Sequence, residues 1–167
     1  MEKAIKNLQI LVTGGAGFIG SHLSEELLKQ EARVVVLDDF SNGRMENLKQ
    51  IKDGIIVIKY DISSPFSDLK ETLKDYTFDG IFHLVCHPRS LSLQNPFRDL
   101  NVNALGILNI LEIAKLNKSK VTFTSNSGIY GDPKYLPINE KHPDNPSVPY
   151  DANKLVSEYY MKIYNRI

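Results

Sequence analysis

Residues 8–23 read LQILVTGGAGFIGSHL, and this stretch decides the fold. It begins with a short apolar run from Leu8 to Thr13, which is typical of a buried strand. A glycine-rich turn follows, and residues 18–31 then carry apolar side chains at helical spacing with charged residues on the opposite face. The stretch therefore predicts a strand, a tight turn and an amphipathic helix in immediate succession.

The same alternation continues along the chain. Further strands are predicted at 33–37, 54–61, 80–85 and 120–125, and helices at 44–52, 66–76, 98–117 and about 150–167. Residues 131–149 hold five prolines and are predicted to form a long loop. Strands that alternate with helices indicate a parallel sheet with right-handed crossovers. We expect one α/β domain over residues 1–167, a Rossmann-type doubly wound sheet of about five parallel strands with helices on both faces.

The turn from Gly14 to Gly20 has the composition of a phosphate-binding loop. It follows a strand and opens a helix, which is the context that a dinucleotide-binding motif requires. Without a Cβ the backbone can approach a diphosphate closely, and the helix N-terminus offers free N–H groups and the positive end of its dipole. The alternative is a tight turn that binds no ligand.

Asp38 lies at the end of the second predicted strand. A carboxylate at that place accepts hydrogen bonds from an adenosine ribose hydroxyl and repels a 2′-phosphate, so it favours NAD over NADP. Arg44 is nearby and argues for NADP, but it lies beyond the turn at residues 41–43. The alternative for Asp38 alone is an exposed acid at a strand end.

Tyr150 and Lys154 stand four residues apart on the last predicted helix. This spacing places them on one face, about one turn apart. A cation beside a phenol is expected to lower the pKa of the phenol, which allows tyrosine to act as a general acid or base. The alternative is a solvated surface pair, which the position after a fifth parallel strand disfavours.

Composition and charge exclude several classes of partner. Twenty basic residues balance twenty acidic ones, so nothing indicates nucleic acid or an anionic membrane. No apolar run is long enough for a membrane span, and the N-terminus lacks the pattern of a signal peptide. The single cysteine, Cys86, excludes an internal disulfide, and we expect a cytoplasmic protein. His83 is predicted to lie in the core and His142 to be solvated, and zinc is not expected at Cys86 and His87.

The chain resembles the extended short-chain dehydrogenase/reductases, within them the NAD-dependent epimerase/dehydratase family and most closely its UDP-glucose 4-epimerase branch. The likeness covers nearly all 167 residues and rests on seven segments in the family's order. These are ILVTGGAGFIGSHL (10–23), VVLDDFSNGR (35–44), YDI (60–62), FHLV (82–85), NVNALGILNILEIAK (101–115), SGIYGDPKYLPINEKHP (127–143) and PYDANKLVSE (149–158).

The resemblance implies a role for particular residues. The diphosphate of NAD would be held by Gly14, Gly17, Phe18, Ile19 and Gly20. The adenosine ribose would be surrounded by Asp38, Asp39, Asn42 and Gly43, and the adenine flanked by Asp61 and Ile62. Leu84 and Val85 would line the cofactor, although the family usually has alanine at the position of Val85, and Asn103 would lie near the nicotinamide. Tyr150 would be the catalytic acid or base, and Lys154 would bind the nicotinamide ribose and tune Tyr150.

The sequence departs from the family at one catalytic position. Four residues before Tyr130 the family carries serine or threonine, whose hydroxyl links the substrate oxygen to the catalytic tyrosine, and this chain has Asn126. An amide donates and accepts hydrogen bonds but has no hydroxyl proton to relay. One hypothesis is that Asn126 polarises the substrate oxygen through its amide or that Ser125 or Ser127 replaces the hydroxyl. The other is that Asn126 marks a weakened or lost activity.

The second departure is length, because the related enzymes are about twice as long. We expect the C-terminal substrate domain to be absent and this chain to be the N-terminal part of such an enzyme. The helices at 98–117 and 149–167 resemble those that build the family's dimer, so a homodimer is expected.

The predicted function is an NAD-dependent sugar-nucleotide 4-epimerase that acts on a UDP-hexose by transient oxidation and re-reduction at C4. The alternatives are a non-catalytic NAD-binding module or inactive fragment, and a nucleotide-sugar dehydratase or decarboxylase. Dehydratases of this family carry an acid pair where Ser127 and Gly128 stand, which disfavours that activity.

Overall fold

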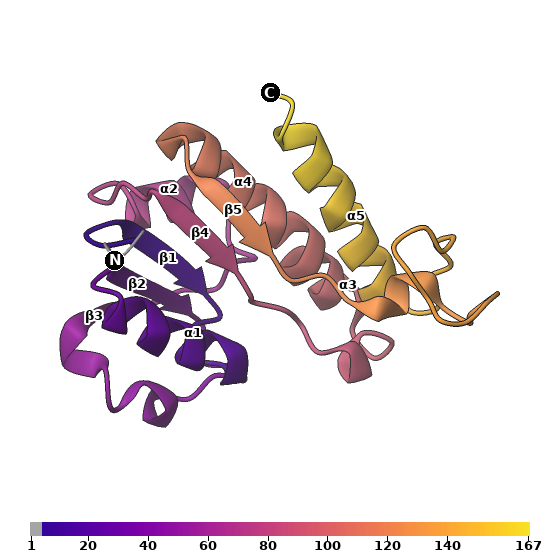
Figure 1. Cartoon of the computed structure of the whole chain (residues 1–167), viewed down its shortest axis with the longest axis horizontal. Coiled ribbons are helices and arrows are strands. Elements are labelled where there is room, and N and C mark those ends of the chain that lie inside the picture. Colours follow the sequence, from indigo (N-terminus) through magenta and orange to yellow (C-terminus); the bar gives the residue numbers. More distant parts are fainter. Residues whose placement is uncertain (1–4) are drawn as a thin grey trace. The chain divides into compact units, whose positions relative to one another are not determined.

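The computed structural model describes residues 5–167, which form two compact units. The first unit contains the chain as far as Val85 together with Asn109–Thr124, and the second contains Cys86–Leu108 and Ser125–Ile167. All five strands of the described residues belong to the first unit, and the second is built from helices and loops (Figure 1).

The sheet of the first unit is parallel throughout, with the order β3-β2-β1-β4-β5. Its strands are β1 (Gln9–Thr13), β2 (Arg33–Asp38), β3 (Ile55–Lys59), β4 (Gly80–His83) and β5 (Lys120–Phe123). The chain runs outward from β1 to β3 and then crosses to β4 on the other side, which is the order of a doubly wound dinucleotide-binding sheet. The predicted fold class and its five strands are confirmed.

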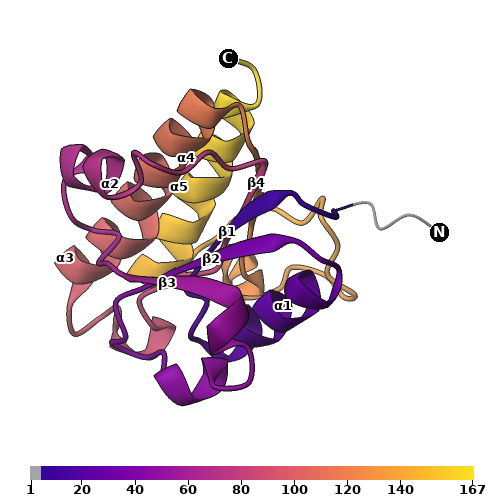
Figure 2. The same cartoon turned by 90° about the vertical axis from the view of Figure 1, so that its left-hand side faces the viewer.

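Three helices of this unit follow the predicted pattern with shorter bounds. They are α1 (Phe18–Lys29), α2 (Phe66–Thr72) and the part of α4 (Gly106–Asn117) that begins at Asn109. Helix α1 lies on one side of the sheet and α2 on the other (Figure 2). The prediction of a helix at 44–52 was wrong, because the chain forms two short 3₁₀ turns there, η1 (Met45–Leu48) and η2 (Lys52–Gly54).

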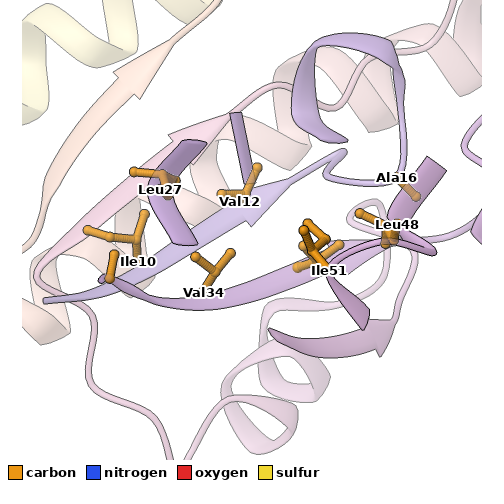
Figure 3. Packing of buried hydrophobic residues seen from close by; sticks show 9 residues of the cluster. Ile10, Val12, Ala16, Leu27, Val34, Leu48 and Ile51 are labelled. Carbon is orange, nitrogen blue, oxygen red and sulfur yellow. The ribbon is translucent and has the colours of Figure 1, made fainter. Parts of the chain in front are cut away.

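The core beneath α1 explains why these segments hold together. Alternate residues of β1 and β2 point to the same face of the sheet, where they meet apolar side chains from α1 and from the segment after β2. The buried members of this cluster are Ile10, Val12, Ala16, Leu27, Ala32, Val34, Val36, Leu48 and Ile51 (Figure 3). Burying one such Leu, Ile or Val side chain contributes about 1.5–3 kcal/mol.

The second unit begins at Cys86 and contains a long helical segment that changes its winding. It comprises α3 (Pro96–Asp99), the π-helical turn η4 (Leu100–Leu105) and the start of α4, where one helix over 98–117 was predicted. Asn95 caps α3, because its side chain accepts a hydrogen bond from the Arg98 N–H at 3.0 Å. π-Turns often occur at functional sites.

The remaining elements of this unit are η3 (Arg89–Leu91), η5 (Ser127–Tyr130) and α5 (Pro149–Tyr164). Helix α5 begins with Pro149, whose missing N–H costs nothing in the first turn. It packs against η4 and α3, so the predicted last helix is confirmed. Among the described residues, no helix combines the length and the apolar character that crossing a bilayer requires.

The prediction that His142 is solvated was wrong. His142 is 3% exposed, and its ring contacts the rings of Tyr130 and Tyr135. Its Nε2 accepts a hydrogen bond from the Lys134 N–H at 2.9 Å, while Nδ1 lies 3.0 Å from the Pro143 carbonyl oxygen. The ring therefore organises the proline-rich loop, because both its nitrogens have backbone partners. His83, by contrast, lies in the core as predicted and bonds to Thr13 at 2.8 Å.

Candidate functional site

The glycine turn of the first unit is shaped by two close approaches. Gly14 has φ +70°, and a Cβ there would lie 2.8 Å from the backbone nitrogen of Val85. A Cβ on Gly20 would collide with the carbonyl oxygen of Gly14 and lie 2.6 Å from the Cα of Gly15. The turn is therefore compact, and it lies directly against the residues that follow β4. Val85 and Leu84, which were predicted to line the cofactor, are thus placed beside the turn, with the Leu84 N–H bonded to Thr13.

Helix α1 begins at this turn with an uncapped N-terminus. Gly17 is its N-cap, and no side chain of the described residues caps this end. The first N–H groups of a helix have no partner inside it, so they are available to an anion. Phe18 and Ile19 flank this end and are 82% and 61% exposed, which is unusual for large apolar side chains. These features fit a bound diphosphate that an apolar rim covers.

Asp38 ends β2 as predicted, but its carboxylate is more enclosed than the sequence indicated. It is 5% exposed and accepts hydrogen bonds from the N–H groups of Ala16 and Phe40, both at 2.9 Å. Burial raises the pKa of Asp38, and the two backbone hydrogen bonds oppose that rise. The carboxylate thus ties the end of β2 to the glycine turn, and each oxygen keeps a lone pair for a further donor.

The other predicted adenosine residues surround this carboxylate at different depths. A Cβ on Gly43 would lie 2.8 Å from Asp38 Oδ1, so Gly43 packs directly on it. Asp39 is more open and accepts bonds from the N–H and hydroxyl of Ser41 at 2.8 and 2.6 Å, and Asn42 is exposed. These side chains form a polar rim around the end of β2.

The predicted adenine residues follow β3. Asp61 accepts bonds from the N–H and hydroxyl of Ser63 at 3.0 and 2.7 Å, which shapes the turn after the strand. Ile62 is 2% exposed, and its carbonyl oxygen accepts a bond from the Asn109 side chain at 2.9 Å. Asp61 keeps partial exposure, whereas Ile62 is held inside the unit.

Asn47 supports the turn and was missed by the sequence analysis. Its Nδ2 donates to the Ala16 carbonyl oxygen at 2.8 Å, and the Arg44 N–H donates to the same oxygen at 3.1 Å. An asparagine in a short polar segment carries no pattern that marks such a contact, because the contact depends on the fold of a distant loop.

In the second unit, Tyr150 and Lys154 lie on one face of α5 as predicted. The Lys154 Nζ is 5.7 Å from the centre of the Tyr150 ring, and Lys154 is 1% exposed. Burial lowers the pKa of Lys154 to about 8, although electrostatic interactions with Cys86 and Asp99 act in the opposite direction. A buried ammonium on this helix excludes the alternative of a solvated surface pair.

The prediction that the Tyr150 pKa is lowered was wrong for the chain without a bound ligand. Burial raises the pKa of the phenol well above its ordinary value, and contact with Cys86 raises it further. Lys154 does not offset these effects, because burial also favours the uncharged amine. The residues of the chain thus hold Tyr150 in its protonated form at neutral pH.

Asn126 lies at the start of η5 with one donor unused. Its Nδ2 is buried and has no hydrogen-bond partner among the described residues. Its neighbour Ser125 donates to Glu158 at 2.6 Å, and Ser127 is exposed. An unpartnered buried amide costs free energy, and this N–H is therefore available to donate to a further acceptor.

Asn103, predicted near the nicotinamide, lies in η4 and is 1% exposed. Its Oδ1 accepts a bond from the His87 N–H at 3.1 Å, and its Nδ2 donates to Asp99 at 3.0 Å. Asp99 also accepts a bond from Asn153, which neighbours Lys154. The sequence indicates no role for Asp99 or Asn153, because isolated polar residues on helices usually face solvent.

A second missed contact lies beside Tyr150. The Arg89 guanidinium donates two hydrogen bonds to the buried carboxylate of Asp151, both at 2.9 Å. The pair joins η3 to the first turn of α5. A Cβ on Gly128 would collide with the same carboxylate, so η5 also packs against it. No group of three metal-ligating side chains occurs within residues 5–167.

Comparisons with known proteins agree with this arrangement. A family model described as GDP-mannose 4,6 dehydratase matches residues 11–167. The chain is 39% identical over 165 residues to a UDP-glucose 4-epimerase of Mycolicibacterium smegmatis, with 96% of this chain and 52% of that protein covered. It is 35% identical over 169 residues to UDP-glucuronic acid decarboxylase 6 of Arabidopsis thaliana, with 96% and 47% covered.

A solved structure has the same fold. The UDP-glucose 4-epimerase of Thermus thermophilus in complex with NAD superposes with a TM-score of 0.86 at 33% identity, over 95% of this chain and 51% of that chain. The chain therefore spans about half the length of the proteins that it matches.

Proposed function

The chain belongs to the GDP-mannose 4,6 dehydratase family, and from this premise we propose that it is the N-terminal, NAD-binding part of a nucleotide-sugar 4-epimerase. The observation that carries the proposal is the uncapped N-terminus of α1 behind a turn in which Gly14, Gly15 and Gly20 leave no room for a Cβ. Such an end binds a diphosphate through backbone N–H groups. The epimerase relative and the NAD complex of the Thermus enzyme support the choice of activity and cofactor.

The proposed cofactor contacts follow the family's pattern. Gly14, Gly17 and Gly20, with the rim of Phe18 and Ile19, hold the diphosphate, and Leu84 and Val85 line the turn. Asp38, Asp39, Asn42 and Gly43 receive the adenosine ribose, and Asp61 and Ile62 flank the adenine. Because Asp38 is an enclosed anion, a 2′-phosphate beside it would be repelled, which favours NAD over NADP.

Three side chains of the second unit perform the proposed proton chemistry. When bound, NAD supplies a reversible acceptor for the hydride on the sugar C4 carbon. Tyr150 takes the proton of the C4 hydroxyl and returns it after the keto sugar has turned. Lys154, with a pKa of about 8, supplies positive charge beside the phenol at neutral pH. Asn126 donates its unpartnered Nδ2 to the sugar oxygen, in place of the family's hydroxyl.

Because the pKa of Tyr150 is raised, this residue can act as a base only if another group favours its deprotonation. Burial and contact with Cys86 raise the pKa of Tyr150, so additional positive charge beside the phenol would favour its deprotonation. When bound, the oxidised nicotinamide would supply positive charge, and Asn103 and Lys154 are the residues that would hold it by the family's pattern. Tyr150 would then act as a base only while the oxidised cofactor is bound, which would couple proton removal to hydride transfer.

A UDP-glucuronic acid decarboxylase is the second candidate, since one such enzyme is 35% identical to this chain. A dehydratase is less consistent with the structure. The family's dehydratases need an acid at the position of Gly128, where a Cβ would collide with the Asp151 carboxylate. A non-catalytic NAD-binding module is the alternative from a different class, and the unused donor of Asn126 disfavours it.

Calorimetric titration of the 167-residue chain with NAD and with NADP tests the cofactor site. We expect NAD to bind and NADP to bind at least about tenfold more weakly, with Asp38→Asn reducing the difference. A folded chain that binds neither dinucleotide would contradict the proposal. Assays with UDP-glucose, UDP-galactose and UDP-glucuronate then separate the activities. We expect feeble or absent turnover from this chain, and robust epimerisation would show that it needs no further substrate residues.

We also propose that the chain forms a homodimer through helices 98–117 and 149–167 and that it resides in the cytoplasm. On α5 the large side chains of Val156, Tyr159 and Ile163 are 40%, 54% and 48% exposed, and they follow one stripe of the helix. The single cysteine is consistent with a reducing compartment. Analytical ultracentrifugation of the wild-type chain and of Ile163→Glu tests the dimer, which the substitution should dissociate.

A further inference from the structure

The second unit holds a buried carboxylate that the proposed chemistry does not use. Asp99 ends α3 and is 0% exposed. Its Oδ1 accepts a hydrogen bond from Asn153 Nδ2 at 2.7 Å, and its Oδ2 accepts one from Asn103 Nδ2 at 3.0 Å. His87 Nδ1 lies 3.3 Å from the same Oδ2. Burying a carboxylate is unfavourable unless donors surround it, and here three side chains converge on one group.

The donors come from the elements that carry the proposed site. Asn153 lies between Tyr150 and Lys154 on α5 and is adjacent to Lys154 in the sequence. One helical turn later, the Ser157 hydroxyl lies 2.8 Å from the Asn103 carbonyl oxygen and 2.8 Å from the Asn153 carbonyl oxygen, so its one proton is shared between them. Helix α5 is therefore docked on the α3–η4 segment by polar contacts in two successive turns, and Lys154 lies between them.

These contacts determine where the side chains of α5 point. Successive residues of an α-helix are rotated by about 100°, so a small rotation of α5 would break the Asn153 contact and turn Lys154 out of its buried position. Burial alone would favour an uncharged Lys154. Electrostatic interactions with Cys86 and Asp99 act in the opposite direction on the Lys154 pKa. The other titratable groups near this face are Tyr150, Asp151 and His87, whose Nδ1 lies 3.3 Å from Asp99 Oδ2.

We propose that Asp99 is a positioning residue, which docks α5 through Asn153 and thereby holds Lys154 in its buried position beside Tyr150. A catalytic role for Asp99 rests on the proposed function, because Asp99 would act only by supporting Tyr150 and Lys154. The docking and the effect on Lys154 can be measured in the chain itself, with no turnover required.

The experiment exchanges the two partners across the contact. Asp99→Asn removes the carboxylate, and Asn153→Asp places a second carboxylate against Asp99. The double variant, which carries both substitutions, again pairs one amide with one carboxylate, now with the carboxylate on α5. The amide at position 99 can accept a hydrogen bond from Asn103 and donate one to the carboxylate at position 153. Asp68→Asn removes an exposed acid of α2 and is the matched control for loss of one charge.

Two measurements are made on each variant. Carbon-detected NMR follows the titration of Lys154, whose midpoint near pH 8 separates it from exposed lysines. Calorimetry gives the affinity for NAD. In Asp99→Asn we expect the Lys154 midpoint to fall by about one pH unit and the NAD affinity to fall about tenfold. The double variant should recover most of both losses, and Asp68→Asn should change neither.

A purely structural role for Asp99 predicts a different result. Asp99→Asn would then lower stability while the Lys154 midpoint stayed in place, and that outcome would overturn the inference. If the single variants fail to fold, the double variant decides the question. A folded double variant whose Lys154 titrates at the wild-type midpoint supports the positioning role of Asp99. A folded double variant whose Lys154 midpoint is not restored contradicts that role. In the wild-type chain, the Asp99 carboxyl carbon should show an inflection at the Lys154 midpoint, and a flat curve there also contradicts it. Absence of NAD binding by the wild-type chain would instead reject the proposed function.

Discussion

The glycine turn of the first unit and the polar cluster around Asp99 in the second unit use different means to shape their surroundings. In the turn, backbone atoms make the close contacts, and the absence of Cβ atoms permits them. In the cluster, the buried side chains of Asp99 and Asn153 are joined by a hydrogen bond, and Lys154, the next residue on α5, is also buried. Backbone packing is insensitive to pH, whereas buried charges respond to it. We therefore expect substitutions in the two regions to change the free energy of unfolding by different amounts and with a different dependence on pH.

The largest effect is expected for Gly20→Ala in the turn. The added Cβ would collide with the Gly14 carbonyl oxygen, which belongs to the backbone and cannot move aside. We expect a loss of about 3 kcal/mol in the free energy of unfolding, measured by urea denaturation, and the same loss at every pH. Gly17→Ala is the matched control, because its Cβ would lie 3.2 Å from the same oxygen. Equal losses in both variants would show that the close approach at Gly20 is not decisive.

The next effect distinguishes the second unit by its pH dependence. Burial holds the pKa of Lys154 at about 8 in the folded chain, below its ordinary 10.5. The unfolded chain therefore binds more protons between these values, so stability should rise with pH in this window. We expect a rise of about 2 kcal/mol between about pH 7.5 and 9.5, and none of it in Lys154→Met. The raised pKa of Tyr150 acts only above about pH 10. Parallel curves for wild type and variant would contradict the buried ammonium.

A smaller effect is expected for Arg89→Ala. The substitution leaves the Asp151 carboxylate buried without its guanidinium partner, and the half-exposed position of Arg89 allows water to compensate in part. We expect a loss of about 1–2 kcal/mol, greater at low salt than at high salt. Lys74→Ala breaks an exposed pair with Glu71 and should change stability by less than about 0.5 kcal/mol. A salt-independent loss at Arg89 would indicate packing of its stem as the main contribution.

The smallest effect returns to the first unit. Asn47→Ala removes the hydrogen bond from Nδ2 to the Ala16 carbonyl oxygen, which the Arg44 N–H also contacts. Because one donor remains, we expect a loss of about 1 kcal/mol in urea denaturation, with no pH dependence. Asn42→Ala is the control, since that exposed side chain has only a 3.4 Å contact with Ser41. A loss of several kcal/mol at Asn47 would show that this bond organises the whole turn.

The sequence predicted the first unit better than the second, for a physical reason. Strand periodicity and the spacing from Gly14 to Gly20 are local patterns, and the order of the strands follows from right-handed crossovers. The position of Asp38 at a strand end was equally local, although its bonds to Ala16 and Phe40 depend on the folded turn. Local patterns of this kind can be read from the sequence because they specify the conformation of the backbone directly.

The contacts of the second unit depend on tertiary packing, so the sequence could not reveal them. Asp99 and Asn153 are 54 residues apart, and each looks like an ordinary polar residue of a helix surface. His142 was predicted to be solvated because it lies in the proline-rich loop, yet it contacts two aromatic rings and is buried. The direction of the pKa shift at Tyr150 was also missed, because spacing along a helix reveals a nearby cation but not how deeply both groups are buried.

The contact between Tyr150 and Cys86 gives this protein a natural place for a reporter. Cys86 is its only cysteine, and its side chain reaches the Tyr150 phenol. Conversion of the thiol to a thiocyanate would install a nitrile whose infrared frequency reads the local electric field. Dinucleotide addition could then be followed as a change in that field at the phenol, with no engineered residue and no background from a second label.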